Sequence, residues 1–298
     1  MPIKSGRKIY SKRLVRNFSK AFVRKAECVI SPSKKTEKYL KYKCKVKNKP
    51  IYIIPTGIDI SPFKSENFSN ESRMILKEKL GIKPNDKVIL FIGRMGEEKS
   101  IDIIMDNMPE IIKNMPNVKF LLVGDGPSRA PLEEQAKKLN ILDNVIFTGK
   151  VPWTDVPMYY NLGDVFVNAS VTETQGLTFI EAMASGVPIV AKYAPNLTEF
   201  ITHNKNGILV RKNSEFSKNI LNVLNNTKLS DKLKENGLET AKMYSSEVFA
   251  DKIEMLYKEI IKNYKLKKNL TDKKEKNKHM KNFYKTVKEK LLLLTKIK

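Results

Sequence analysis

The chain has 298 residues, of which 41% are hydrophobic and 30% charged, a composition typical of a folded protein with one or two domains and not of a disordered chain. No apolar run approaches the roughly 18 residues of a membrane-spanning helix, and no apolar segment opens the chain, so we expect neither a transmembrane helix nor a signal peptide. Two cysteines, Cys28 and Cys44, cannot build a disulfide framework, which favours a reducing, cytoplasmic setting.

The net charge of +24 is concentrated at the two ends of the chain. Residues 1–50 carry 17 basic and 2 acidic side chains, and residues 258–298 carry 15 and 4, whereas 51–257 carry 24 and 26. Basic ends predict an anionic partner, either a nucleic acid or an anionic membrane surface. Because no RNP, KH or zinc-finger pattern occurs, we expect no specific nucleic-acid partner. The alternative is a lysine-rich composition with a solvated tail.

The first 50 residues predict only part of a domain. Apolar side chains recur every fourth residue among basic ones and predict a basic amphipathic helix: Tyr10, Leu14, Phe18 and Phe22. A strand at 27–30 and a helix at 32–42 follow. A single strand–helix unit cannot bury its own apolar face, so residues 1–50 are interpreted as the remnant of a larger domain.

From residue 51 to about 210, short apolar runs alternate with helical patterns. The runs predict strands at 51–54, 88–92, 118–123, 145–148, 164–168, 188–191 and 207–210. Between them we expect helices at 102–114, 131–139, 153–162, 177–185 and 195–202. Continuous apolar strands that alternate with helices are typical of a doubly wound parallel sheet, so the predicted fold class is α/β.

The C-terminal part predicts three further helices, at 214–224, 231–243 and 247–264, with Ser246 as the N-cap of the last. The last one carries an apolar stripe and is predicted to pack on one face: Phe249, Ile253, Leu256, Tyr257, Ile260 and Tyr264. Residues 265–279 are polar and predict a disordered linker. A second amphipathic stripe follows in the tail: Met280, Phe283, Tyr284, Val287, Leu291 and Leu294. The predicted division is 1–50, 51–245, 246–264 and 265–298.

The segment 170–186, SVTETQGLTFIEAMASG, gives the strongest indication of a site. Glu173 lies in a loop, Glu181 in the second turn of the following helix, and Gly176 just before that helix. Free amides of residues 175–178 at the helix start form an anion site, and ionised carboxylates beside it suit the hydroxyls of a sugar. The alternative is a loop and helix in which Glu181 is merely solvated.

A second candidate follows the strand at 88–92, in FIGRMGEEK. Gly93 permits a tight turn, and Arg94 and Lys99 then lie near the C-terminal edge of the sheet, where open α/β sheets bind ligands. A guanidinium and an ammonium group together match a diphosphate. Two ordinary surface cations are the alternative. No cluster of histidine and cysteine residues with zinc-ligand spacing occurs, and His203 has no neighbour that would make it a general base.

Taken in order, six segments resemble the retaining, nucleotide-sugar-dependent glycosyltransferases of family 4, which have the GT-B fold. They are CVISPSKKTEKYL (28–40), IIPTGIDISPF (53–63), FIGRMGEEKSID (91–102), LLVGDGP (121–127), VIFTGKV (145–151) and ETQGLTFIEAMASGVPIVA (173–191). The resemblance runs from about residue 20 to 264. The variants ETQGLT and IPTGID are similar to those of bacterial diacylglycerol glucosyltransferases.

The resemblance implies a role for each candidate residue toward a nucleotide-sugar donor, most simply UDP-glucose. Arg94 and Lys99, beyond the turn at Gly93, would bind the diphosphate and stabilise it as the leaving group, and Glu181 would bind the ribose. Glu173 would bind the transferred sugar. Backbone amides would assist on the sugar and the β-phosphate, from Thr174, Gln175, Gly176 and Leu177. The loop of Lys150 and Val151 would lie against the base. Family members of this kind need no metal and no other cofactor.

The family has two halves, and the N-terminal half carries the acceptor site, a glycine-rich loop and a histidine near the reacting sugar. Only the last piece of that half is present here, and no histidine precedes His203. We therefore expect a donor-binding half, whose missing part would come from another polypeptide unless the chain is a truncated or split-gene product.

The expected function is transfer of a hexose, with retention, to a lipid such as diacylglycerol or glucosyl-diacylglycerol by an enzyme peripheral on the inner face of the cell membrane. Two alternatives remain: a transferase for a polysaccharide or lipid-linked oligosaccharide, and a non-catalytic donor-binding subunit.

Overall fold

The computed structural model describes residues 17, 19–23, 26–46 and 49–294. The chain forms two units, 1–249 and 250–298, and the first contains all the strands described. The boundaries expected at residues 50, 245 and 264 stay predictions.

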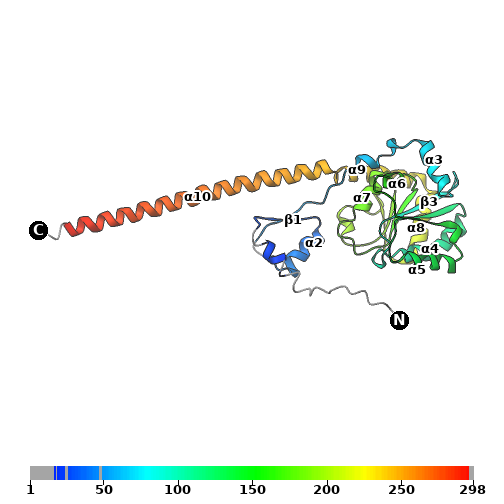
Figure 1. Cartoon of the computed structure of the whole chain (residues 1–298), viewed down its shortest axis with the longest axis horizontal. Helices are drawn as coiled ribbons and strands as arrows, with labels where there is room; N and C mark the ends of the chain where they lie inside the picture. The colour runs from blue at the N-terminus through cyan, green and yellow to red at the C-terminus, as the bar shows by residue number, and fades with distance from the viewer. Residues whose placement is uncertain (1–16, 18, 24–25, 47–48, 295–298) are drawn as a thin grey trace. The chain divides into compact units, whose positions relative to one another are not determined.

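A six-stranded parallel sheet forms the centre of the first unit (Figure 1). Its strands are β3 (Lys87–Ile92), β4 (Val118–Val123), β5 (Val145–Gly149), β6 (Val165–Asn168), β7 (Ile189–Lys192) and β8 (Ile208–Val210). They lie in the order β5-β4-β3-β6-β7-β8, and every pairing is parallel. Six of the strands predicted from the apolar runs are therefore confirmed in this sheet, whereas the strand predicted at 51–54 forms β2 (Ile51–Ile53) of another sheet.

Both faces of the sheet are buried, because alternate residues of a strand point to opposite sides. In β3, Ile89 and Phe91 belong to one core cluster, and Val88 and Leu90 to the other. The first face is covered by α4 (Ile101–Asn114), α5 (Arg129–Lys138) and α8 (Phe216–Asn225), and the second by α6 (Val156–Tyr160) and α7 (Leu177–Ala184). The helix α9 (Thr227–Lys242) contributes to both clusters. The predicted doubly wound α/β fold is confirmed.

The N-terminal segment forms a separate two-stranded parallel sheet, in which β1 (Val29–Ser31) pairs with β2 (Ile51–Ile53). Between the strands, α2 (Lys34–Lys38) begins at a cap, since the Thr36 amide donates to Ser33 Oγ at 3.3 Å, and continues into a π-helical turn, η1 (Tyr39–Lys43). The strand and helix expected at 27–42 are confirmed. The amphipathic stripe upstream lies mostly outside the described residues: Phe22 is described and exposed, whereas Tyr10, Leu14 and Phe18 are not.

The helix predicted at 195–202 is wrong, because only a 3-10 turn forms there, η6 (Leu197–Glu199). The Asn206 side chain explains the difference. Its amide nitrogen donates to Phe200 O at 2.8 Å and its oxygen accepts from Thr202 N at 2.7 Å, so it takes backbone groups that a helix would pair internally.

Conversely, α3 (Asn70–Lys79) forms where no helix was predicted, starting at the cap Ser69 with no fully buried residue in it. The other short turns are η2 (Ser61–Phe63), η3 (Ser65–Asn67), η4 (Glu97–Lys99), η5 (Leu142–Asn144) and η7 (Asn213–Glu215).

The disordered linker predicted at 265–279 is also wrong, because α10 (Ser246–Leu294) continues through it. No glycine or proline follows Gly237, and lysine is a good helix former, so nothing in the sequence ends the helix. Ser245 caps it instead of Ser246, since Ser245 Oγ accepts from the Val248 amide at 3.3 Å. Among the described helices, none is long and apolar enough to cross a membrane.

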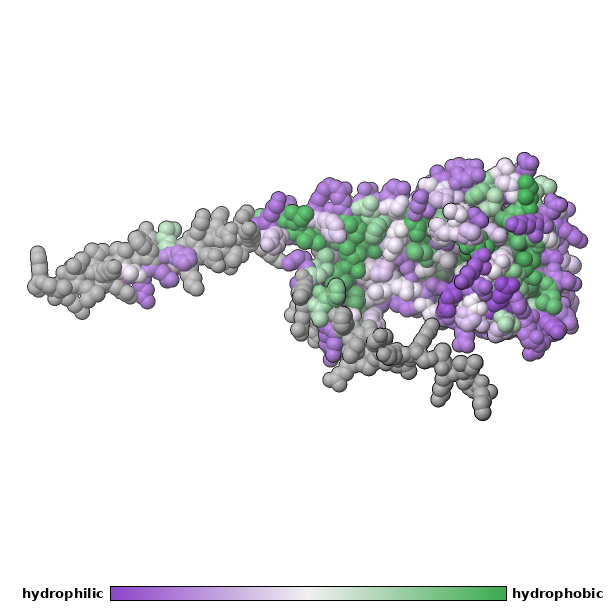
Figure 2. Space-filling model, viewed as in Figure 1, coloured by the Kyte–Doolittle hydropathy of each residue, from purple (hydrophilic) through white to green (hydrophobic). Residues whose placement is uncertain are grey.

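The packed face predicted for residues 247–264 extends less far than expected. Leu256 is buried, but Tyr257 and Tyr264 are more than half exposed. In the tail, the backbone is helical as expected, and of the six stripe residues only the Met280 side chain is described, at 53% exposed. Apolar side chains therefore stand beside lysines on the surface of α10 (Figure 2).

Candidate functional site

The strand order reverses between β3 and β6, and this point defines the site. The chain runs outward from β3 through β4 to β5, then returns to place β6 on the other side of β3. Ligands of open α/β sheets bind outside the carboxyl ends of the strands at such a switch point. The loops that leave β3 and β6 there carry the two strongest sequence motifs, 93–100 and 169–176.

The loops after β3 and β4 touch backbone to backbone. Gly124 has φ +130°, and a Cβ on it would lie 2.1 Å from Gly93 O. The Met95 amide donates to Asp125 O at 2.9 Å, and the Ser128 amide to Met95 O at 3.0 Å. The absence of a side chain at Gly93 and Gly124 thus allows the two loops to pack directly against each other at the carboxyl edge of the sheet.

Lys99 and Glu173, from the loops after β3 and β6, meet at the switch point. Lys99 Nζ lies 2.6 Å from Glu173 Oε1, and the two side chains are only 22% and 13% exposed. The Glu173 carbonyl accepts hydrogen bonds from Asn196 Nδ2 at 3.0 Å and Lys35 Nζ at 2.9 Å. The fold therefore brings the two predicted residues together, and their opposite charges form an ion pair.

Arg94 is not brought to this pair. Its guanidinium is 57% exposed and forms an ion pair with Glu98, four residues further along the loop. A backbone hydrogen bond, followed by the Arg94 contact and the nearby charge of Lys99, holds the pKa of the Glu98 carboxyl below its ordinary value. A ligand at the switch point would therefore compete with Glu98 for the Arg94 guanidinium.

The helix α7 begins at the edge of the site. Gly176 precedes it with φ +79°, and a Cβ there would lie 2.7 Å from Phe179 Cδ2, so only glycine fits without strain. No side chain of the described residues caps α7, which leaves amides at its start for an anion. Thr174 is exposed and Leu177 half-buried beside this opening.

Glu181, one turn into α7, is buried and paired. It is 6% exposed, and its Oε2 accepts a hydrogen bond from the Tyr160 hydroxyl at 2.7 Å. Burial raises the pKa of Glu181, and the Tyr160 hydrogen bond acts against that rise. Burial also raises the pKa of Tyr160, as does the charge of Glu181, so the hydroxyl stays the proton donor. The alternative of a merely solvated Glu181 is wrong.

Lys150 and Val151 follow β5, two strands away from β3. Gly149 turns the chain with φ +74°, Lys150 is exposed, and Val151 packs against the second core cluster. Because β5 lies two strands from β3 and three from β6, a ligand that touches Lys150, Lys99 and Glu173 would span the edge from β5 to β6.

Four residues at the site were not predicted: Tyr160, Asn196, Lys35 and Thr56. Tyr160 is an apolar position in a helical pattern, and Lys35 is one of many N-terminal lysines, so neither differs from its neighbours in sequence. The Thr56 backbone pairs with the Gln175 side chain, a contact without any sequence pattern. Only the fold shows these contacts.

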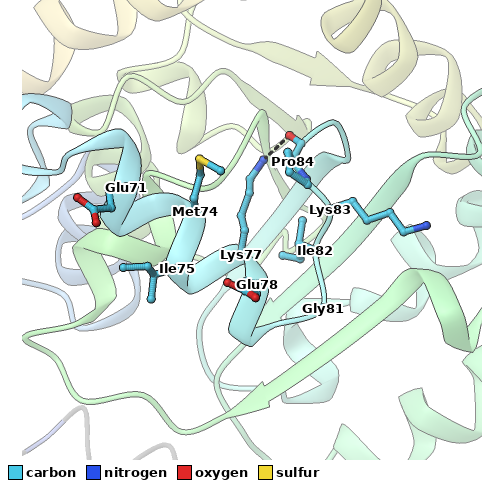
Figure 3. A pocket seen from close by; sticks show the side chains of 9 residues that line it. All are labelled: Glu71, Met74, Ile75, Lys77, Glu78, Gly81, Ile82, Lys83 and Pro84. Carbon is cyan, nitrogen blue, oxygen red and sulfur yellow. Dashed lines mark hydrogen bonds between the residues drawn. The ribbon is translucent and has the colours of Figure 1, made fainter.

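An apolar groove of about 750 Å³ lies elsewhere, along α3, with Met74, Ile75 and Ile82 in its wall (Figure 3). None of the predicted site residues lines it. In the described part of the chain, no three histidine, cysteine, aspartate or glutamate residues are grouped as metal ligands.

Residues 72–240 match the family model described as glycosyl transferases group 1, and residues 3–62 match that of glycosyltransferase family 4. The chain belongs to the group 1 glycosyltransferases. It is similar to the alpha-monoglucosyldiacylglycerol synthase of Acholeplasma laidlawii, with 34% identity over 87% of this chain and 65% of the relative. The enzyme of the same name from Streptococcus pneumoniae is 33% identical over 86% and 57%.

Among solved structures, Anabaena HepE in complex with UDP has a TM-score of 0.74 at 22% identity, over 84% of this chain and 69% of that one. This group 1 glycosyltransferase therefore shares an α/β fold with GT-B glycosyltransferases over part of their length, in agreement with the prediction of part of a GT-B fold. The chain spans somewhat less than two thirds of the length of the two synthases.

Proposed function

We propose that the site binds a nucleotide-sugar donor, most simply UDP-glucose. The observation that carries this proposal is the meeting of Lys99 and Glu173 at the switch point, beside the uncapped start of α7. A cation and free amides suit a diphosphate, and a carboxylate next to them suits sugar hydroxyls. The two similar synthases are named for a glucosylated product, monoglucosyldiacylglycerol, and HepE has been crystallised with UDP-glucose.

In this proposal each group has one task. Lys99 leaves Glu173 to bind the diphosphate, together with the α7 amides and Arg94. These positive groups stabilise the leaving UDP as the bond between the anomeric carbon and the β-phosphate oxygen breaks and the acceptor hydroxyl oxygen bonds to that carbon. Glu173, released from Lys99, accepts hydrogen bonds from the sugar. Glu181 accepts from the ribose hydroxyls, since among the described residues only Tyr160 occupies its carboxylate. Lys150 and Val151 lie against the base. No metal is needed for this set of contacts.

We propose a lipid acceptor such as diacylglycerol or glucosyl-diacylglycerol, with retention at the sugar carbon. The names of the two similar synthases support the acceptor, and the basic ends of the chain support a position on the anionic inner face of the cell membrane. The chain spans only part of those relatives, so we also propose that the acceptor site is completed by a further polypeptide segment.

Isothermal titration calorimetry with UDP-glucose tests the donor site. We expect binding by the wild-type chain and its loss in Glu181→Ala, with a smaller loss in Arg94→Ala. A chain that binds UDP-glucose no better than Glu181→Ala would contradict the donor site. Turnover of UDP-glucose with diacylglycerol then tests the acceptor, and turnover with a polysaccharide alone would contradict the lipid.

A further inference from the structure

Gln175, in the loop between β6 and α7, ties that loop to a distant part of the chain. Its Oε1 accepts a hydrogen bond from the Thr56 amide at 2.9 Å, and its Nε2 donates to the Thr56 carbonyl at 2.8 Å. The Gln175 carboxamide thus forms hydrogen bonds with both the amide and the carbonyl group of Thr56, and the two bonds together restrain the orientation of the carboxamide. Thr56 lies just after β2, in the segment that connects the N-terminal sheet to the rest of the first unit.

The same loop is tied a second time, at Glu173. Lys35 Nζ, from α2, donates to Glu173 O, and Asn196 Nδ2 donates to the same oxygen. Next to Lys35, the amide of Lys34 donates to Glu199 Oε2 at 3.0 Å. Lys35 and Thr56 therefore hold the loop at two places, Lys35 at Glu173 and Thr56 at Gln175, and Thr56 does so through both its amide and its carbonyl group.

The loop needs such support because it has no regular hydrogen bonding of its own. Residues 169–176 are neither strand nor helix, and Thr174 is exposed. A loop that is free before binding must lose conformational freedom when a ligand arrives, and this weakens binding. A loop that is already held presents its amides without that loss.

We propose that Gln175 is a positioning residue, whose carboxamide clamps the loop to Thr56 and so presents the amides of residues 174–177 to the sugar and β-phosphate of the donor. This inference rests on the proposed function. It assigns the Gln175 side chain a role that the family resemblance, which implied only its backbone amide, did not give. It also makes the segment just after β2 a support of the donor site.

The test compares three nucleotides on the full chain by calorimetry: UMP, UDP and UDP-glucose. UMP has the base and ribose, but lacks the β-phosphate and sugar that the clamped loop meets. The variants are Gln175→Met, which keeps the size and loses both hydrogen bonds, and Gln175→Glu, which sets a carboxylate oxygen against Thr56 O. Gln135→Met is the matched control, because Gln135 also makes two hydrogen bonds, to Asp102 O and Asp106 Oδ1, between α4 and α5.

We expect both Gln175 variants to lower the affinity for UDP and UDP-glucose by about tenfold, as the loss of two hydrogen bonds predicts, and to leave UMP binding unchanged. Gln135→Met should leave all three affinities unchanged. An equal loss for UMP would overturn the inference, because Gln175 would then support the fold in general. Unchanged UDP-glucose affinity in Gln175→Met would overturn it as well.

Hydrogen exchange of the unliganded chain separates this inference from the proposed function. We expect faster amide exchange in residues 171–177 and 54–58 of Gln175→Met than of the wild type, and unchanged exchange there would overturn the clamp. If the wild-type chain binds none of the three nucleotides, the proposed donor site is overturned, and the exchange result still decides whether Gln175 holds the loop.

Discussion

The Tyr160 hydroxyl, fully buried, donates a hydrogen bond of 2.7 Å to the carboxylate of Glu181. Its ring lies between those of Phe63 and Phe166, with centroids 5.6 and 5.9 Å away, so the hydroxyl is held in place by the core. The core of the sheet domain thus orients a carboxylate of the proposed donor site, and the Tyr160 hydrogen bond opposes the rise in the pKa of Glu181 that burial causes.

Tyr160→Phe should weaken UDP binding. It should also raise the pH at which UDP affinity is lost as the solution is acidified. Burial already raises the pKa of Glu181, and the hydroxyl opposes that rise, so its removal raises the pKa further. In the proposed donor site the ionised carboxylate binds ribose, so affinity for UDP should be lost as the pH falls through this pKa. Calorimetry across a pH series measures the shift, and Tyr159→Phe, which lacks the contact, is the control. Identical pH profiles for wild type and Tyr160→Phe would contradict the prediction.

The same pKa predicts how stability depends on pH. A carboxyl whose folded pKa is raised binds more protons in the folded state, so its contribution to stability falls as the pH rises from the unfolded pKa through the folded one. Glu181→Gln should therefore be more stable than the wild type above that window and gain nothing below it. Urea unfolding at acidic and neutral pH measures this difference. A pH-independent difference would show that Glu181 is not buried as an ion.

Glu173→Gln should separate sugar binding from diphosphate binding. The change removes the charge that holds Lys99, so Lys99 is free for the diphosphate and UDP affinity should rise by about two- to tenfold. UDP-glucose should gain less, because the sugar loses a charged acceptor. Lys99→Met should weaken both ligands. If Glu173→Gln weakened UDP as much as UDP-glucose, the ion pair would not compete with the diphosphate.

Gly176→Ala should be more destabilising than Gly186→Ala, although both glycines have positive φ, +79° and +67°. At Gly186 an added Cβ meets nothing within 4 Å, so only the backbone cost of about 1 kcal/mol applies. At Gly176 the Cβ also meets the Phe179 ring, which should add roughly 1–3 kcal/mol. Chemical denaturation of both variants measures the difference, and equal losses would contradict the predicted clash.

The full chain should sediment with vesicles of anionic phospholipid at low salt and be released at high salt. Each lysine near such a surface contributes about 1 kcal/mol, and α10 exposes Lys258, Lys262 and Lys265 beside Tyr257 and Ile261. Changing the three lysines to glutamine should weaken sedimentation, with neutral vesicles as the control. No binding to anionic vesicles at low salt would favour the alternative of a lysine-rich, solvated tail.

The sequence by itself determined the strands and the loops that carry the site. Strands buried on both faces must be continuous apolar runs, so β3 to β8 could be read directly, and the loops that leave β3 and β6 carried Lys99 and Glu173. It also indicated the family, because the segment from Glu173 to Glu181 has the residue types and the spacing that are typical of family 4 glycosyltransferases.

Only the tertiary structure decided which groups meet. Lys99 pairs with Glu173 because β3 and β6 are neighbours, an order that no local pattern contains. Arg94 pairs with Glu98, Tyr160 with Glu181 and Gln175 with Thr56. Local pattern misjudged residues 195–202 because the Asn206 side chain, just after them, pairs with their backbone groups. It misjudged residues 265–279 because polar residues without glycine or proline can remain helical. Periodicity reports which residues are buried, whereas hydrogen-bond partners are fixed by how the chain packs.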